Sequence, residues 1–366
     1  MTVREGSVVL VVGVRSPAAL ELVRQLAFHG LVVEGADFLR FPLGRFSSRL
    51  TVYHRLPSPR WRPADFRLGW NRLLQRAYAA VFACNEEIFW LSRQPQQPPL
   101  AVWNEPAGLE TLHRKDDFVQ LLQRLGLPAP RTCLPGQVAE LGGRPFILKR
   151  IYSRFGGATR LEPDPHKLPS EPGWLAQERM VGEEVCFSGF GWRGQLVTGC
   201  CYRSRWGDLG QHRGAGLHFE RLCRPDLEAQ AAEVIRALGY SGPIGVDFVG
   251  GTAVECNPRW TSGIHLLDLT PVLRVLGLAT RSGWRVPARV QLAAAMLLRC
   301  RAGLDFWRDW WGTSDAIWSA ADPWPALAQP LVLMETAWRA GRRRINLSQA
   351  LTWDIEWNGL ADVAPM

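Results

Sequence analysis

The sequence predicts a protein of mixed α/β and α+β class, with an α/β domain first, α+β segments in the middle and a helical extension at the end. An apolar run at residues 7–14, a helical pattern at 16–28 and a second strand at 31–37 make a β-α-β start. Two glycines separate a pair of strands within 244–257, as in a hairpin. The 366 residues are enough for two or three domains.

The composition is globular with a basic surplus. Hydrophobic residues make up 47% of the chain and charged residues 21%, and the net charge is +9. A basic surplus suits nucleic acid, but the arginines are dispersed apart from Arg342-Arg343-Arg344, and no nucleic-acid-binding signature is present. We therefore expect a phosphate-rich small ligand rather than nucleic acid.

The sequence also predicts the compartment. No apolar run approaches the ~20 residues that a membrane-spanning helix needs, and the first residues pass into a strand without a signal cleavage site. Eight cysteines occur without a CxxC pair, which disfavours zinc and predicts buried free thiols. We expect a cytoplasmic protein without a transmembrane segment.

The first domain is expected to end near residue 105. Its first strand is followed by Gly13 but not by the G-x-G-x-x-G pattern, so it lacks a dinucleotide-binding fingerprint. A helix is expected at 61–80, and the strand after it, 81–84, ends on the polar run Asn85-Glu86-Glu87.

Two lysines and a glycine-rich loop follow. Residues 109–126 have a continuous apolar stripe, which predicts one helix that carries Lys115. A strand at 144–150 carries Lys149 near its end. Paired glycines in the next loop let backbone N–H groups approach phosphate oxygens, and a serine adds a donor. The loop residues are Ser153, Gly156 and Gly157. A solvated lysine and an ordinary hairpin are the alternatives.

The middle of the chain predicts further strands and a linker. Strands at 174–178 and 185–190 flank a short linker and an acidic pair, Glu183-Glu184. Another strand is expected at 195–201, followed by a Gly- and Arg-rich loop at 202–216 that contains Arg203. A helix at 226–238 then leads into the hairpin.

The hairpin offers a set of oxygen ligands. If its loop has three residues, Gly250 to Thr252, Asp247 lies opposite Glu255, and Asn257 shares their face because it is two residues further on. Carboxylate and amide oxygens suit Mg²⁺ or Mn²⁺. A two-residue loop would put the carboxylates on opposite faces, and an ordinary hairpin with solvent-facing polar residues is the alternative.

Residues 266–366 are rich in tryptophan. Helical segments are expected at 287–298, 325–340 and 347–351, two of which open with proline. Tryptophan together with arginine suits a membrane surface or a base-stacking platform. We favour a helical extension packed against the core that precedes it.

These features together resemble the ATP-grasp superfamily. Asp247 followed by the run Glu255-Cys256-Asn257-Pro258-Arg259 is similar to its metal-binding end, where an acidic residue precedes Glu-x-Asn-Pro-Arg. The helix lysine, the strand lysine with its loop, and the linker come in the family's order over about residues 1–270. The resemblance implies an ATP-grasp fold with an N-terminal Rossmann-like domain and a C-terminal helical extension, and ATP held between two α+β subdomains.

The resemblance also implies a role for each residue. Metal ions, Mg²⁺ or Mn²⁺, would be held by Asp247, Glu255 and Asn257. ATP phosphates would be held by Lys115, Lys149, Ser153, Gly156 and Gly157. Adenine would lie against Glu178, Arg179 and Val181, and the ribose hydroxyls would bind Glu184. Arg259 and Arg203 would be catalytic, through developing charge or a substrate carboxylate.

The implied activity is that of an ADP-forming carboxylate–amine ligase, which uses ATP to activate a small carboxylate as an acylphosphate before an amine attacks. The implied division is a Rossmann-like domain at 1–105, a small subdomain with the glycine-rich lid at 106–180, a large subdomain with the metal site at 181–270, and the extension at 271–366. Biotin-carboxylase-like carboxylation and a non-catalytic ATP-binding regulatory protein are the alternatives. A homodimer is a common assembly in the superfamily.

Overall fold

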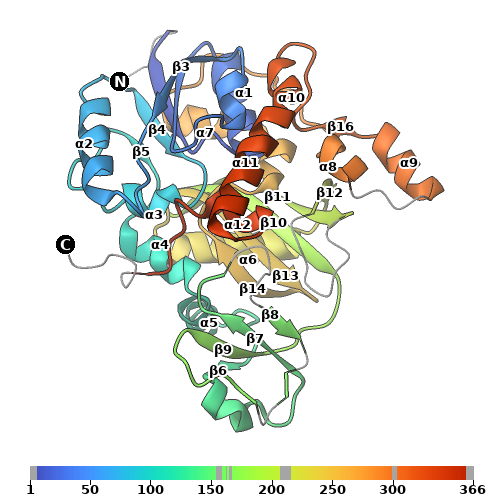
Figure 1. The fold of residues 1–366 in the computed structure, drawn as a ribbon. Coiled ribbons are helices and arrows are strands. Elements are labelled where there is room, and N and C mark those ends of the chain that lie inside the picture. Colours follow the sequence, from blue (N-terminus) through green and yellow to red (C-terminus); the bar gives the residue numbers. More distant parts are fainter. Residues whose placement is uncertain are drawn as a thin grey trace.

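The structure, a computed structural model, describes residues 6–153, 159–161, 163–164, 167–206, 216–298 and 303–359. Its strands form three sheets (Figure 1). The glycines Gly156 and Gly157 of the predicted phosphate loop lie outside the described residues.

The first sheet confirms the predicted β-α-β start. Its five strands are parallel, in the order β3-β2-β1-β4-β5, and α1 (Pro17–Phe28) joins β1 to β2. The strands are β1 (Val8–Val12), β2 (Val32–Asp37), β3 (Leu50–Arg55), β4 (Ala80–Ala83) and β5 (Ala101–Val102). The remaining elements are η1 (Leu43–Phe46), α2 (Pro63–Leu73) and α3 (Glu87–Leu91). The helix predicted at 61–80 is therefore too long, because Ala79 already donates to the carbonyl of Val8 in the sheet.

The second sheet belongs to a separate lobe, at the bottom of Figure 1. It is antiparallel, in the order β6-β9-β7-β8. Its strands are β6 (Thr132–Cys133), β7 (Phe146–Arg150), β8 (Thr159–Leu161) and β9 (Trp174–Glu178). Helices α4 (Pro106–His113), α5 (Lys115–Arg124) and η2 (Pro135–Leu141) accompany it. The single helix predicted at 109–126 is wrong, because Arg114 is extended (φ −71°, ψ 121°) and divides it.

The third sheet has seven strands in the order β14-β13-β10-β11-β12-β15-β16. They are β10 (Glu184–Trp192), β11 (Gln195–Arg205), β12 (His218–Leu222), β13 (Gly242–Val249), β14 (Thr252–Asn257), β15 (Arg289–Gln291) and β16 (Ser314–Asp315). Helices α6 (Pro225–Ala237), η3 (Ser262–Leu266) and α7 (Thr270–Val275) also belong to this part. The last two strands come from the predicted extension, so the sheet crosses the boundary expected at residue 270.

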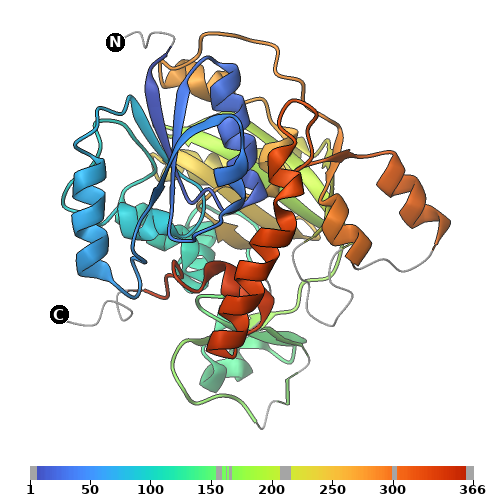
Figure 2. The same cartoon turned by 45° about the horizontal axis from the view of Figure 1, so that its top comes forward.

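The last part of the C-terminal extension folds back over the first domain (Figure 2). Its helices are α8 (Ala293–Leu298), α9 (Leu304–Trp311), α10 (Trp324–Leu327), α11 (Gln329–Arg343) and α12 (Leu347–Thr352). The predicted helix at 287–298 is wrong in its first half, where β15 pairs with β12 instead. The helix at 325–340 is divided into α10 and α11, and the one at 347–351 is confirmed.

Ion pairs show where the extension packs. Arg24 pairs with Asp322 (Nε to Oδ2, 3.0 Å), and Arg60 pairs with Glu356 (Nη1 to Oε2, 2.5 Å). The expectation that the extension packs against the ATP-grasp core is therefore only partly correct, because the extension also contacts the Rossmann-like domain.

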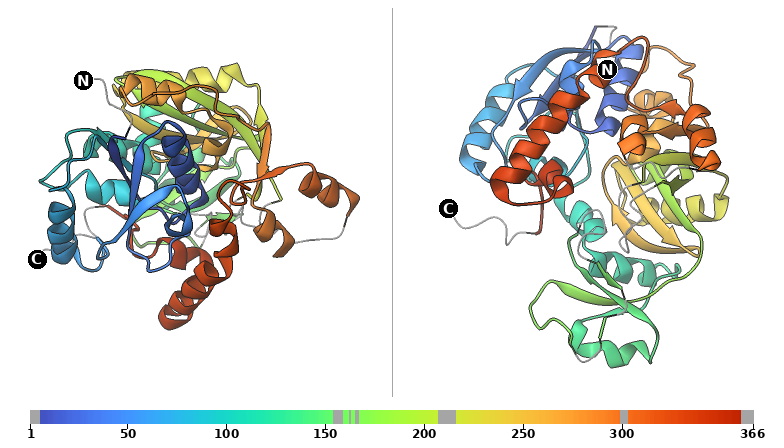
Figure 3. Two further views of the ribbon diagram at one scale, coloured as in Figure 1. Left: turned by 90° about the horizontal axis from the view of Figure 1, so that it is seen from above. Right: turned by 45° about the vertical axis from the view of Figure 1, so that its right-hand side comes forward.

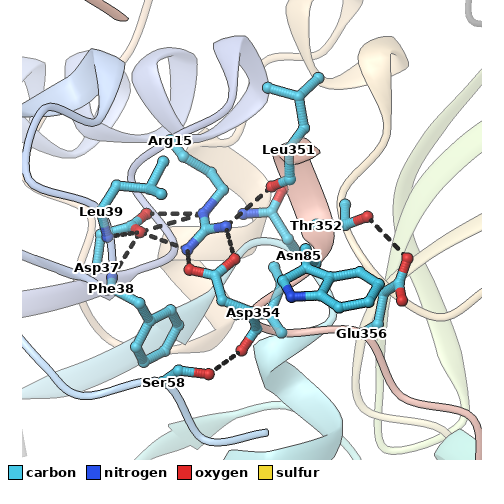
Figure 4. A network of polar contacts seen from close by, with 12 residues as sticks. Arg15, Asp37, Phe38, Leu39, Ser58, Asn85, Leu351, Thr352, Asp354 and Glu356 are labelled. Carbon is cyan, nitrogen blue, oxygen red and sulfur yellow. Dashed lines mark hydrogen bonds and ion pairs between the residues drawn. The ribbon is translucent and has the colours of Figure 1, made fainter. Parts of the chain in front are cut away.

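A buried arginine fastens the end of the chain to the carboxyl edge of the parallel sheet (Figure 4). The guanidinium of Arg15 lies between Asp37 (Nη2 to Oδ1, 2.6 Å) and Asp354 (Nη1 to Oδ1, 2.6 Å), and also donates to the carbonyl of Leu351. Trp357, three residues further on, is fully buried in the adjoining core. The crevice where open α/β sheets commonly bind ligands is thus filled by the chain's own C-terminal segment.

Two further predictions can be compared with the described residues. All seven cysteines in the described part of the chain are unpaired. Four are buried as predicted, but Cys133 and Cys186 are only partly buried and Cys223 is exposed. Within the same residues, none of the helices has the length and apolar character needed to cross a membrane.

Candidate nucleotide and metal site

The hairpin brings Asp247 opposite Glu255, as predicted, but by a different route. Its loop has two residues, Gly250 and Gly251, both with positive φ (58° and 83°). A β-bulge at Val254 then shifts the register by one residue, so that the two carboxylates face each other. The predicted three-residue loop is therefore wrong, although the pairing that it was meant to produce is present.

Asn257 joins the two carboxylates on the hairpin. Its amide nitrogen donates to Asp247 (Nδ2 to Oδ2, 3.3 Å), and its amide oxygen accepts from Arg259 (Nη2 to Oδ1, 3.3 Å). Hydrogen bonds thus connect Asp247, Asn257 and Arg259, and Glu255 lies opposite Asp247 on the paired strand, which makes a set of four residues. Three of the four could give oxygen ligands to a hard cation.

Lys115 reaches this set from α5. It is the first residue of α5, directly after the break at Arg114, and its ammonium lies 3.3 Å from the carboxylate of Glu255 (Nζ to Oε1). The side chain is only 1% exposed. A continuous helix through Arg114 would have given Lys115 a different direction, so the break helps to aim it at Glu255.

Lys149 reaches the same place from β7. Its ammonium donates to the carbonyl of Val254 (Nζ to O, 3.1 Å), the residue that forms the bulge. A bulge leaves a residue out of the ladder, which makes its backbone groups available to other partners. The bulge therefore both aligns the two carboxylates and gives Lys149 an acceptor.

The charges at the site perturb one another. Burial lowers the pKa of Lys149 to about 8, although Glu255 opposes the shift. Burial and the nearby charge of Glu255 raise the pKa of Asp247 to about 6. Burial alone would raise the pKa of Glu255 as well, but Lys115 and Lys149 outweigh it and hold that pKa below its ordinary value. A cation between the two carboxylates would relieve the repulsion that disfavours ionised Asp247.

Strand register places the predicted ribose ligand on the same face. Glu184 pairs with Val249, and Cys186 pairs with Asp247. Paired residues share a face, as do residues two apart on one strand, so Glu184 and Asp247 project from the same side of the sheet. The thiol of Cys186 also hydrogen-bonds to Asp247, a contact that sequence reasoning missed because it depends on the pairing of two strands 60 residues apart.

The predicted adenine linker is docked on the hairpin turn. The N–H of Gly250 donates to the carbonyl of Glu183 (2.9 Å), and a Cβ on Gly182 would lie 2.6 Å from the Cα of Gly250. Only glycine fits this approach. Val181 is 82% exposed on the linker, and its apolar side chain is available to a flat ring.

The other linker residues are held by the small lobe. The carboxylate of Glu178 pairs with Arg144 (Oε1 to Nη1, 2.9 Å), and the N–H of Arg179 donates to the carbonyl of Pro145 (2.8 Å). Their backbone is thereby fixed beside β7, the strand that carries Lys149.

Arg203, a predicted catalytic residue, stands apart from the hairpin set. Arg203 is on β11 rather than in a loop, and it pairs with Glu220 on β12 (Nη2 to Oε2, 2.5 Å). Arg289 on β15 binds the same carboxylate, so this arginine belongs to a cross-strand ion network. Ser153 is partly buried at the start of the predicted phosphate loop.

The residues present fit a magnesium ion. The described residues contain no group of three or more histidine, cysteine, aspartate or glutamate side chains that could hold a metal by themselves, so an ion at the hairpin would need ligands from elsewhere as well. The hairpin has two carboxylates and an amide, all oxygen ligands, as suits an ion that takes its remaining ligands from phosphate and water.

Comparisons with solved structures show that the arrangement of the three sheets is an ATP-grasp fold. No family model matches the chain, and no curated protein matches its sequence.

Three solved structures show the likeness. An N5-carboxyaminoimidazole synthetase from Staphylococcus aureus is 14% identical, with a TM-score of 0.59 over 75% of this chain and 78% of that one. A biotin carboxylase from Campylobacter jejuni is 14% identical, with a TM-score of 0.58 over 75% and 72%. An L-amino acid ligase from Bacillus licheniformis is 14% identical, with a TM-score of 0.54 over 73% and 71%.

Proposed function

We propose that this chain is an ADP-forming ligase that binds Mg·ATP between its small lobe and the hairpin and joins a carboxylate to an amine. The observation that carries the proposal is the convergence of Lys115, on α5, and Lys149, on β7, on the strand that carries Glu255. Two buried cations beside two opposed carboxylates suit a metal-bound polyphosphate, because each phosphate oxygen needs a positive partner.

Asp247, Glu255 and Asn257 would hold the Mg²⁺ (or Mn²⁺) ions. Such ions would offset the charge that develops during phosphoryl transfer. Asp247 is the residue whose ionisation gains most from them, because burial and Glu255 raise its pKa to about 6 in their absence.

The chain's own cations complete the phosphate site. Lys115 and Lys149 would bind the β- and γ-phosphates, and Arg259, tied to Asn257, would lie beside the transferred group. The ammonium of Lys149, with its pKa lowered to about 8 by burial, would gain a charged partner when phosphate enters. The linker and Glu184 would place adenine and ribose.

The proposed reaction has two steps. A substrate carboxylate oxygen attacks the γ-phosphorus of ATP, so that a new O–P bond forms and the bond to ADP breaks. The amine nitrogen then attacks the carbonyl carbon of the acylphosphate, so that a C–N bond forms, the C–O bond breaks and inorganic phosphate leaves. The amine proton passes to solvent or to the departing phosphate.

A second candidate is carboxylation with bicarbonate as the acceptor of the phosphoryl group. A biotin carboxylase shares the fold to the same degree as the ligases, so fold likeness does not separate the two reactions. A substrate panel that includes bicarbonate with and without biotin distinguishes them.

The test is ADP release with Mg·ATP across panels of amino acids and small carboxylates, with product masses measured. Glu255→Gln should abolish turnover in a protein that stays folded, and Asp247→Asn should do so less completely. The matched control is Glu233→Gln, which replaces a partly exposed glutamate on α6 that pairs with Arg236, and it should keep full activity. Full activity in Glu255→Gln would overturn the metal site, whereas ATP binding without ADP release on any panel would favour a regulatory protein.

A further inference from the structure

The exposed apolar side chains of this protein are concentrated in its C-terminal extension. In the described part of the chain, 13 of the 20 exposed large hydrophobic residues lie between residues 297 and 351. Five of them are tryptophans: Trp307, Trp311, Trp318, Trp324 and Trp338. Such a concentration is more than the scattered exposure that folded proteins ordinarily tolerate.

Helix α11 directs some of its polar side chains toward the protein. The carboxylate of Glu335 accepts from the N–H groups of Arg40 and Phe41 (3.0 and 2.7 Å). Arg339 is 8% exposed and pairs with Asp354 (Nη2 to Oδ2, 2.9 Å). A surface helix ordinarily buries its apolar stripe and exposes its polar one.

The outward side of α10 and α11 is apolar. We call Trp324, Leu327, Leu333, Met334 and Trp338 the apolar face; their exposed fractions run from 51% to 62%. Figure 3 (left) shows α11 at the outer edge of the molecule, and among the ribbons of the described residues none lies outside it in that view. Hydrogen bonds and ion pairs hold the helix in this orientation, so the exposure is built into the fold.

The charge beside the apolar face is positive. Arg342, Arg343 and Arg344 are exposed at the end of α11. Among the described residues from 303 to 352, Asp305 is the only exposed acid, and it is paired with Arg308. A second copy of this chain would bring a surface of the same sign, and its net charge is +9. An anionic partner is therefore favoured over self-association.

We propose that the apolar face and the three arginines dock on the surface of an anionic lipid membrane. Tryptophan prefers the boundary between headgroups and acyl chains, because its ring is apolar and its N–H is polar. Apolar side chains on one side of a helix with basic residues beside them are the pattern of an interfacial helix. Arginines near the surface of an anionic membrane add affinity through charge.

The experiment is flotation of the full chain with vesicles of phosphatidylcholine alone and with one quarter phosphatidylglycerol. The wild type should float with the anionic vesicles and much less with the neutral ones. The variant L333Q/M334Q/W338Q should lose at least tenfold in partitioning, because three anchoring side chains become polar. Leu68→Gln is the matched control: Leu68 is 57% exposed on α2, far from the apolar face in sequence, and its replacement should change nothing.

Charge and self-association are tested separately. Arg343→Gln should weaken binding to anionic vesicles by about fivefold, which corresponds to about 1 kcal/mol per basic residue. Equal flotation with both vesicle types, or unchanged flotation of the triple variant, would overturn the proposal. So would sedimentation velocity that shows a wild-type dimer, dissociated by the triple variant, together with no flotation of the wild type. Nucleotide binding should be the same in all these variants, because none of the replaced residues contacts the hairpin.

Discussion

Replacement of Asp354 by asparagine should loosen the C-terminal segment from the first domain at a cost of about 3 kcal/mol. Asp354 is 3% exposed, and its two oxygens pair with Arg15 (2.6 Å) and Arg339 (2.9 Å). Arg15 keeps Asp37 in the variant, but Arg339, whose one ion pair in the described residues is with Asp354, becomes a buried unpaired cation. Breaking a buried ion pair from one side costs ~3–5 kcal/mol, and the asparagine oxygen can still accept one hydrogen bond, which favours the lower end.

The pH dependence has a definite sign. Burial alone would raise the pKa of Asp354, but Arg15 and Arg339 outweigh it and hold that pKa below its ordinary value. The stability that this residue contributes is therefore fully present above its ordinary pKa and is lost as the pH falls through its folded pKa. Asp354→Asn should remove this part of the acid sensitivity.

Urea unfolding followed by circular dichroism measures the change, and limited proteolysis shows whether residues near 345–359 become cleavable. Asp305→Asn is the control: Asp305 is exposed and pairs with Arg308 three residues away, so its replacement should cost less than about 1 kcal/mol. If the free energy of unfolding of Asp354→Asn lies within about 0.5 kcal/mol of the wild-type value, the range of an ordinary surface substitution, the ion network does not hold the segment in place.

Three further predictions concern the candidate site and the first domain. Lys115→Ala and Lys149→Ala should each weaken Mg·ATP binding by roughly tenfold or more in calorimetry, because a charged hydrogen bond is worth ~1.5–3 kcal/mol. The control Lys167→Ala, at an exposed lysine, should leave the affinity unchanged. Unchanged affinity in both site variants would remove the phosphate assignment. Glu184→Ala should reduce the preference for ATP over 2′-deoxy-ATP, and a variant that discriminates as the wild type does would exclude Glu184 as the ribose ligand. Burial raises the pKa of Glu87 to about 7, so its contribution to stability should fall as pH rises from about 4.5 to 7, by about 3 kcal/mol, and melting of Glu87→Gln should lack that slope; equal slopes in the two proteins would contradict it.

Much of the candidate site follows from local patterns. The sequence predicts the first β-α-β unit, the hairpin glycines, the strand lysine and the carboxylate and amide at Glu255 and Asn257, because each depends on residues close together in the chain. The fold class follows from the order of these patterns. Lys115 is predicted as a phosphate ligand even though the helix that carries it begins at that residue and not earlier.

The tertiary structure decides how these parts face one another. The bulge at Val254 aligns Asp247 with Glu255, and no local pattern shows it, because a bulge is settled by the partner strand and by the lysine that takes its carbonyl. The same reason applies to Arg203, whose strand continues because β12 pairs with it.

The sequence by itself determined which chemical groups this protein has near its hairpin and in what order its elements come. Only the tertiary structure decided that Arg15 meets Asp354, 339 residues later, and that α11 turns its polar side inward. The physical reason is that the hydrophobic period of a helix shows which side is apolar, but not which side is buried. Here the hydrogen bonds that Glu335 accepts and the ion pair of Arg339 outweigh the usual preference, and the apolar side stays exposed.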